Sequence, residues 1–273
     1  MKNPKTNHLV LNKFSKDLDG WGNLFKELAD VEITLNSKNF RCEEFGTNQN
    51  KEHLLFSGCS TTFGYGLEED ELWSKKLYKK IKKDKEVSGY FNLAMPGIGC
   101  LEIVANIFKY INKFGNPNAI FIALPDVYRD YVEIKTAVKD KSPEYLVRHA
   151  IYDNSIYDKS SEICKINTFH YLLFLETYCK SNNIKLYIFS WDHKFPKMDL
   201  DRFFIFSEKS FIDFFKKNSN HYLTEKYAIT SRDDHHVGTA YHDFWCDSFY
   251  NIYTGEREKI VNWTRIGRAL RSS

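Results

Sequence analysis

HLLFSGCSTTFGYG, residues 53–66, joins a short apolar run to a turn rich in small residues. The run HLLFSG (53–58) is typical of a strand buried on both faces of a parallel sheet. After the turn, EEDELWSKKLYKKIKK (68–83) has apolar residues at helical spacing, with an acidic start and a basic end that suit the helix dipole. This region therefore predicts a strand, a turn and a helix in succession.

The same alternation continues along the chain. Further strands are predicted at 89–95, 118–125 and 184–192, and further helices at 100–115, 166–183 and 239–255. Strands that alternate with helices form βαβ units, which build a mostly parallel sheet covered by helices on both faces. We therefore predict an α/β protein, a three-layer α/β/α sandwich around a mostly parallel sheet of about five strands.

The chemistry-bearing segments lie near both ends of the chain, which favours one domain over two. We expect this domain to span residues 51–255. Residues 1–50 are predicted to be an N-terminal extension that covers part of the core, and 256–273 a basic C-terminal tail. Residues 126–162 are polar and too long for a simple connection, and they are predicted to be an irregular insertion. A second irregular insertion is predicted at about 193–225.

Composition excludes several classes of function. The chain has 39 basic and 36 acidic residues and a net charge of +3, which gives no general case for nucleic-acid binding. Its apolar runs fall short of the ~18 residues that span a bilayer, and no signal peptide is visible at its start. We therefore expect a soluble, cytoplasmic protein. The six cysteines are scattered singly, without a CxxC pair, and are expected to be free thiols rather than a zinc cluster.

Ser60 stands between the end of the first predicted strand and the start of a helix. Backbone N–H groups at such a position are able to bind a developing oxyanion, and neighbouring glycines allow a substrate to approach the backbone closely. An ordinary Ser/Thr turn that caps the next helix would have the same sequence pattern. Taken alone, the turn is therefore compatible with either a catalytic or a structural role for Ser60.

Asp233 and His236 lie just before the last predicted helix. A carboxylate three residues before a histidine can fold back onto the ring Nδ1, which leaves Nε2 free to face a serine hydroxyl. The alternatives are a polar loop in which Asp233 or Asp234 caps the helix, and a metal site built from two Asp and two His. Four adjacent residues rarely converge on one ion, so we expect no metal here.

Together these segments resemble the SGNH/GDSL hydrolases. GCSTTFG (58–64) is similar to the first block of that family, FNLAMPG (91–97) to its second block, and Asp233-xx-His236 to its last block. The resemblance covers about residues 53–253 and implies a flavodoxin-like fold without a cofactor. Carried across by position, Ser60 is the nucleophile, His236 the general base and Asp233 its orienting acid, while the backbone N–H groups of Ser60 and Gly97 form the oxyanion hole.

Two positions depart from the family pattern. Cys59 replaces the aspartate of the first block and is expected to point into the core rather than to act as a nucleophile. Pro125 occupies the place of an asparagine that donates to the oxyanion, a loss that typically costs ~10²–10³ in rate. Candidate pocket residues are Asn92, Asp126 and Arg129. Asn92, Arg129 or the insertion would supply a substitute donor, or Asp126 and Arg129 would instead form a structural ion pair.

The sequence thus predicts a serine esterase that acts on a small ester or an O-acylated carbohydrate or lipid. The missing asparagine and the insertions motivate a second hypothesis, a catalytically weak or inactive binding module with the same fold. A third hypothesis is a sugar O-acyltransferase that uses the same three residues.

Overall fold

The computed structural model describes residues 31–47, 52–125, 154–190, 200, 203–205, 208–222, 225–233 and 236–255. All structural statements below concern these residues. Asp126 and Arg129, and the predicted tail at 256–273, lie outside them.

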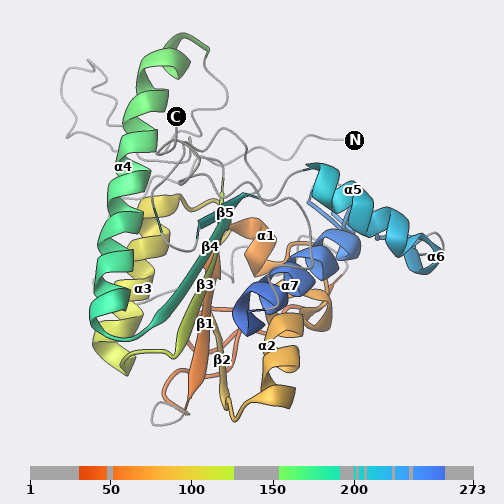
Figure 1. Ribbon diagram of the computed structural model, residues 1–273, viewed down its shortest axis with the longest axis horizontal. Helices are drawn as coiled ribbons and strands as arrows, with labels where there is room; N and C mark the ends of the chain where they lie inside the picture. Colours follow the sequence, from red (N-terminus) through yellow and green to blue (C-terminus); the bar gives the residue numbers. More distant parts are fainter. Residues whose placement is uncertain are drawn as a thin grey trace.

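Five parallel strands form a single sheet in the described part of the chain, in the order β2-β1-β3-β4-β5 (Figure 1). The strands are β1 (His53–Gly58), β2 (Gly89–Asn92), β3 (Ala119–Leu124), β4 (Lys185–Ser190) and β5 (Phe203–Ile205). The first four occupy the segments that were predicted from apolar runs. β5 lies inside the stretch 193–225 that was predicted to be irregular, because three residues are too few to produce a recognisable pattern.

The helices follow the strands in the expected alternation. They are α1 (Ser60–Phe63), the 3₁₀ helix η2 (Glu69–Glu71), α2 (Trp73–Asp84), α3 (Cys100–Phe114), α4 (Asn154–Ser181), α5 (Glu208–Lys217), α6 (Ser219–Tyr222) and α7 (Thr239–Thr254). Two expectations were wrong. α4 begins at Asn154 rather than at residue 166, since its polar first turns hide the helical period. The stretch 193–225 also contains α5 and α6 and is therefore not irregular.

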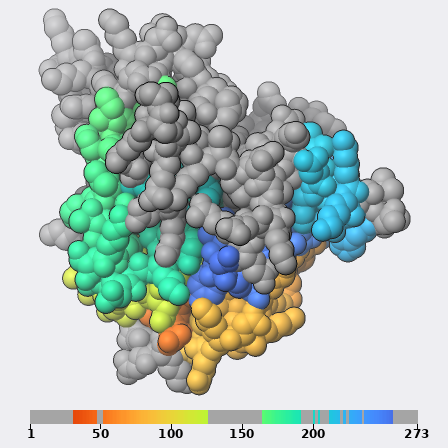
Figure 2. All heavy atoms as spheres, viewed as in Figure 1, coloured from red at the N-terminus to blue at the C-terminus, as the bar shows by residue number. Residues whose placement is uncertain are grey.

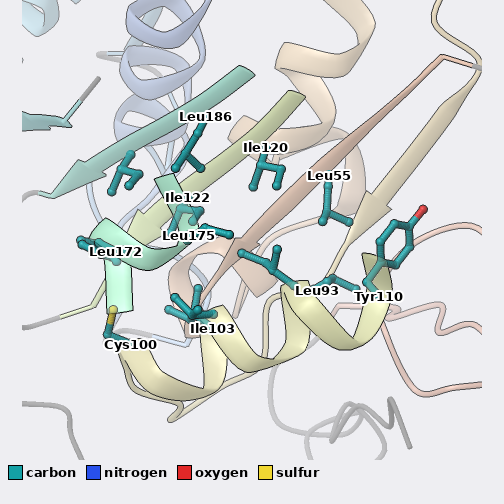
Figure 3. Close-up of a cluster of buried hydrophobic side chains, with 14 of the residues drawn as sticks. Leu55, Leu93, Cys100, Ile103, Tyr110, Ile120, Ile122, Leu172, Leu175 and Leu186 are labelled. Atoms are coloured by element: carbon teal, nitrogen blue, oxygen red, sulfur yellow. The ribbon is translucent and has the colours of Figure 1, made fainter. Parts of the chain in front are cut away.

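The helices cover both faces of the sheet, which confirms the three-layer α/β/α architecture. α3 and α4 lie on one face, and α2 and α7 lie on the other (Figure 1). Alternate residues of each strand point to opposite faces, as the pleat requires. Leu55, Ile120 and Ile122 therefore pack toward α3 (Figure 3). Their neighbours Phe56 and Phe121 pack toward α2 and α7.

An aromatic layer fills the α2 and α7 side of the sheet. Phe121 is fully buried and stacks between Phe56 on β1 and Tyr187 on β4, with ring centroids 5.3 and 4.9 Å away. Phe249 of α7 meets Phe121 edge-on at 5.5 Å and stacks on Trp73 of α2 at 4.9 Å. One ring layer thus joins three strands to two helices.

α2 and α7 are also joined at the surface, where they lie side by side (Figure 2). Lys76 and Lys80, one turn apart on α2, pair with Asp243 and Asp247, one turn apart on α7. These ion pairs fix the register between the two helices. α7 directly follows the loop that carries Asp233 and His236.

Residues 31–47 of the predicted N-terminal extension pack on this domain. Phe40 and Arg41 are almost completely buried, and Val31 and Ile33 pack against Phe63. This segment therefore forms part of the core close to the Ser60 turn.

All six cysteines lie in the described part of the chain; none of them forms a disulfide there, and five of them are buried. Within the described ranges, no helix combines the length and the apolar composition that crossing a membrane requires.

Replacing Phe121 with alanine tests the role of the aromatic layer. Phe121→Ala removes a ring that contacts two strands and α7, so we expect a loss of about 3–5 kcal/mol in the free energy of unfolding. Ile166→Ala is the control, because Ile166 is 52% exposed on α4 and should change stability by less than about 0.5 kcal/mol. Urea denaturation of both variants measures the difference, and equal effects would contradict a central role for the ring layer.

Candidate functional site

Ser60 is the first residue of α1 and follows directly after the carboxyl end of β1, a central strand of the sheet. The chain turns at Gly58, where a Cβ atom would lie 2.3 Å from Thr62 Oγ1 and 2.7 Å from the Ala123 carbonyl oxygen. Only glycine allows this close approach. Ser60 is thereby placed at the rim of the sheet where ligands of open α/β folds bind.

The loop that carries Asp233 comes very close to the Ser60 turn at Gly66. Gly66 has φ +69°, and a Cβ atom there would lie 2.8 Å from Ser231 Oγ and 2.9 Å from the Asp233 backbone nitrogen. The Arg232 N–H donates a hydrogen bond of 3.2 Å to the Gly66 carbonyl. Segments more than 160 residues apart thus touch backbone to backbone at this glycine.

Asp233 and His236 form a hydrogen-bonded pair, with Asp233 Oδ2 2.5 Å from His236 Nδ1. Asp233 Oδ1 accepts the backbone N–H of His236 at 3.0 Å and the hydroxyl of Ser231. The Asp233 side chain is 8% exposed and that of His236 is 27% exposed. The structure therefore contains the contact that the spacing predicted: the carboxylate fixes one ring nitrogen, and Nε2 remains available on the other side of the ring.

Tyr65 links this pair to the Ser60 turn. Its ring stacks on the His236 imidazole, with centroids 5.1 Å apart and planes 20° from parallel. Its backbone N–H donates to the Ser60 carbonyl at 3.3 Å. Burial, reinforced by the nearby Asp233 carboxylate, raises the pKa of Tyr65 well above its ordinary value, so this side chain stays neutral. One residue thus connects the serine and the imidazole.

The Ser60 hydroxyl is not hydrogen-bonded to His236 in this structure. Among the described residues its recorded contact is with the Cys59 thiol, 3.9 Å away. Ser60 is 8% exposed, and a rotation about its χ1 bond would redirect the hydroxyl. Hydrogen bonds between nucleophile and base are often long in unliganded enzymes and tighten only when substrate is bound.

Arg232 fastens the two loops together. Its guanidinium makes a bidentate ion pair with Glu71, at 2.7 and 3.0 Å, and Nη1 also donates to the Gly66 carbonyl. Burial alone would raise the pKa of Glu71, but the hydrogen bonds from Arg232 and from the Glu68 backbone, with the charge of Arg232, lower it. Glu71 is therefore ionised at neutral pH and holds Arg232 in place.

Of the candidate oxyanion and pocket residues, Gly97 and Asn92 lie in the described part of the chain. Gly97 is exposed in the loop after β2, with φ +80°, and its N–H has no backbone acceptor among the described residues. Asn92 is fully buried. Its amide donates to the Thr62 carbonyl at 3.1 Å and accepts from the Ala94 N–H at 3.0 Å. Asn92 therefore holds the Ser60 turn from its buried side, through the Thr62 carbonyl.

Two further expectations concern residues beside the site. Cys59 is 5% exposed and belongs to the α3-side core, as predicted for an apolar thiol. Pro125 is buried immediately after β3 and has no N–H to donate. Asp234 and His235, which the alternative metal site requires, lie outside the described residues.

His242 is a buried histidine whose partner no sequence pattern indicates. Its Nδ1 accepts the Trp73 backbone N–H at 2.9 Å, at the first residue of α2. Burial holds the pKa of His242 well below its ordinary value, so the ring is neutral and able to accept this bond. His242 is therefore a structural cap between α7 and α2.

Sequence reasoning missed Arg41, Tyr65 and Arg232. Tyr65 lies between Gly64 and Gly66 in the turn 59–66, and no local pattern indicates that its ring stacks on His236. Arg232 directly precedes Asp233, but its partner Glu71 lies 161 residues away in the sequence, so no local pattern pairs them. Arg41 lies in the predicted extension, where no local pattern distinguishes a buried arginine from an exposed one.

No protein-family model matches the sequence, and no curated protein matches it significantly. Among solved structures, the fold is similar to the psychrotrophic esterase EstA from Pseudoalteromonas sp., with 12% identity, a TM-score of 0.44, and coverage of 75% of this chain and 98% of that chain. It is also similar to TesA, with 10% identity, a TM-score of 0.44, and coverage of 76% and 98%. The acetyl xylan esterase AlAXEase has 11% identity, a TM-score of 0.42, and coverage of 73% and 98%. Similarity this distant assigns no activity.

The close approach at Gly66 can be tested by adding one methyl group. Gly66→Ala combines the strain of a positive φ, about 1–2 kcal/mol, with a clash against the Asp233 loop. Gly255→Ala is the matched control, since Gly255 has φ +81° and no atom within 4 Å of the added Cβ. Thermal unfolding should therefore show a clearly larger loss of stability for Gly66→Ala. Equal losses would mean that the two loops are not in contact.

Proposed function

We propose that this protein is a serine-dependent ester hydrolase that works through an acyl-enzyme, with Ser60 as nucleophile, His236 as general base and then acid, and Asp233 as the residue that orients His236. The observation that carries the proposal is the Asp233–His236 pair stacked against Tyr65 of the Ser60 turn. A carboxylate, an imidazole and a serine in this order are the parts that acyl transfer requires.

In the first half of the proposed cycle, Ser60 Oγ attacks the carbonyl carbon of the ester while His236 Nε2 takes the hydroxyl proton. Asp233 keeps the other proton on Nδ1 and stabilises the imidazolium that forms. The carbonyl oxygen becomes an oxyanion, which would accept hydrogen bonds from the N–H groups of Ser60 and Gly97. Collapse of this intermediate expels the alcohol, which receives the proton from His236.

In the second half, His236 takes a proton from water, and the hydroxide that develops attacks the acyl carbon. The carboxylic acid leaves, and the proton returns to Ser60. Because Pro125 cannot donate to the oxyanion, we expect turnover to be slower than with a complete set of donors, by up to ~10²–10³. Suitable substrates are small esters and O-acylated carbohydrates or lipids.

A second candidate function is a binding module that retains the fold without efficient catalysis. Two observations favour it: the Ser60 hydroxyl faces the Cys59 thiol, and Pro125 stands where a donor would be needed. An O-acyltransferase would use the same three residues, with a sugar hydroxyl in place of water. The sugar acceptor would then appear acylated among the products.

Labelling with a fluorophosphonate tests the proposal directly. We expect one adduct on Ser60, located by peptide mass spectrometry, and hydrolysis of p-nitrophenyl acetate. Ser60→Ala should abolish both, and Asp233→Asn should lower kcat by up to ~10⁴, because the imidazole loses its tautomer and orientation.

Cys59→Ala is the matched control, since it removes the neighbouring nucleophile and leaves Ser60 in place. It should retain labelling and most of the activity. A folded wild-type protein that forms no adduct on Ser60 would support the binding module instead, and an adduct on Cys59 would assign the chemistry to the thiol.

A further inference from the structure

We infer that Arg41 is a positioning residue for the proposed nucleophile: its guanidinium holds the turn that presents Ser60, although it comes from the segment preceding the sheet. This inference rests on the proposed function, because it concerns how Ser60 is held for attack. It assigns a catalytic contribution to residues 31–47, which otherwise look like a covering extension.

The geometry of Arg41 is directed entirely at the turn. Nη1 donates to the carbonyl oxygens of Phe63 and Gly64 at 3.2 and 2.7 Å, and Nη2 donates to the Leu67 carbonyl at 2.7 Å. The guanidinium carbon also lies 5.9 Å from the Phe63 ring centroid. Three backbone oxygens, at the end of α1 and just beyond it, thus converge on one side chain.

These carbonyls need a donor because the turn is buried. Residues 62–67 are all buried, so their carbonyl groups are shielded from water. The Gly64 carbonyl also accepts the Leu67 N–H at 3.2 Å, whereas the Phe63 and Leu67 carbonyls receive donors from Arg41. A loop at the surface would use water for this purpose. Here the fork of an arginine, with several donors in fixed geometry, replaces the water.

Arg41 is 1% exposed, and its contacts within the described ranges are hydrogen bonds to carbonyl oxygens rather than an ion pair. Burial lowers the pKa of Arg41, and the charges of Glu68, Glu69 and Glu71 offset this only in part. The buried Nε has no hydrogen-bond partner there. Burying a cation without a counter-ion is costly, and its hydrogen bonds to carbonyl dipoles offset only part of that cost. If position 41 only filled space in the core, an apolar residue would fill it at a lower cost in the free energy of folding. The arrangement makes sense where the position of the turn itself matters, since displacing a nucleophile by about 1 Å can cost 10²-fold in rate.

Gly64 shows how closely the guanidinium is fitted. It has φ +87°, and a Cβ atom there would lie 3.0 Å from Arg41 Nη1 and 2.0 Å from a Leu72 methyl group. A side chain at this position would be strained by the positive φ and would displace Leu72 and the guanidinium. Lysine at position 41 would keep the charge, but a single ammonium cannot bridge three carbonyls in the same way.

The test compares Arg41→Lys with the wild-type protein by two measurements. One is the rate of fluorophosphonate labelling at Ser60. The other is kcat, normalised to the number of sites that the fluorophosphonate titrates. We expect both to fall by about 10- to 100-fold, with KM changed by less than about threefold, because the serine is misplaced while the pocket remains. The midpoint of the pH–rate profile should not move, since His236 and Asp233 are untouched.

Asn36→Ala is the matched control for stability. Asn36 fixes the same segment, by accepting the N–H groups of Lys38 and Phe40, but does not contact the Ser60 turn. It should lower the melting temperature and leave kcat per labelled site unchanged. Arg41→Gln serves as the second variant if Arg41→Lys does not fold. In a rescue experiment, Arg41→Ala should regain labelling when millimolar guanidinium is added, but not when sodium chloride is added at equal ionic strength.

The outcomes separate this inference from the proposed function. If wild-type Ser60 is labelled and Arg41→Lys is labelled at the same rate, the positioning role of Arg41 is overturned and the hydrolase stands. If the folded wild-type protein is not labelled at Ser60, the proposed function fails, and the role of Arg41 in it fails as well.

Discussion

The Ser60 turn is buried, and its backbone carbonyl groups must find hydrogen-bond donors inside the protein. Side chains from three distant segments supply them. Asn92 of β2 donates to the Thr62 carbonyl, Arg41 donates to those of Phe63, Gly64 and Leu67, and Arg232 donates to that of Gly66. A buried carbonyl left without a donor costs about 1–3 kcal/mol, so these contacts together determine where the turn lies. The site depends on this network, because the turn carries both Ser60 and Tyr65.

The same turn is also the contact point for the loop that carries Asp233 and His236. Gly66 admits the backbone of the Asp233 loop, Arg232 ties that loop to Glu71, and Tyr65 stacks on His236. The loop in turn is anchored to the body of the domain through α7, whose ion pairs and aromatic contacts fix it against α2. The position of the His236 imidazole relative to the sheet thus depends on the packing of α7 in the aromatic layer, which lies away from the Ser60 turn.

Much of the architecture could be predicted from sequence, because its signals are local. The apolar runs at β1 and β3 are continuous, and the period of α3 is regular, so their bounds differ by a residue or less from those predicted. β5 has only three residues, and α5 follows it after two residues, so the apolar residues from Phe203 to Phe215 show neither a strand period nor a helical period clearly. The contact of Asp233 with His236 is also local, since the two are three residues apart. What holds Ser60 was not predictable, because Arg41 acts on a turn more than 20 residues away and its burial is a property of the folded chain.

The central claim is that Ser60 and His236 act on one carbonyl group. A crystal structure of the protein after reaction with a small fluorophosphonate tests it most directly. We predict that phosphorus is bonded to Ser60 Oγ and that His236 Nε2 lies within hydrogen-bond distance of an adduct oxygen. We also predict a phosphonyl oxygen about 2.7–3.2 Å from the N–H groups of Ser60 and Gly97. An adduct that leaves His236 turned away, with its Nε2 out of hydrogen-bond reach, would contradict the account.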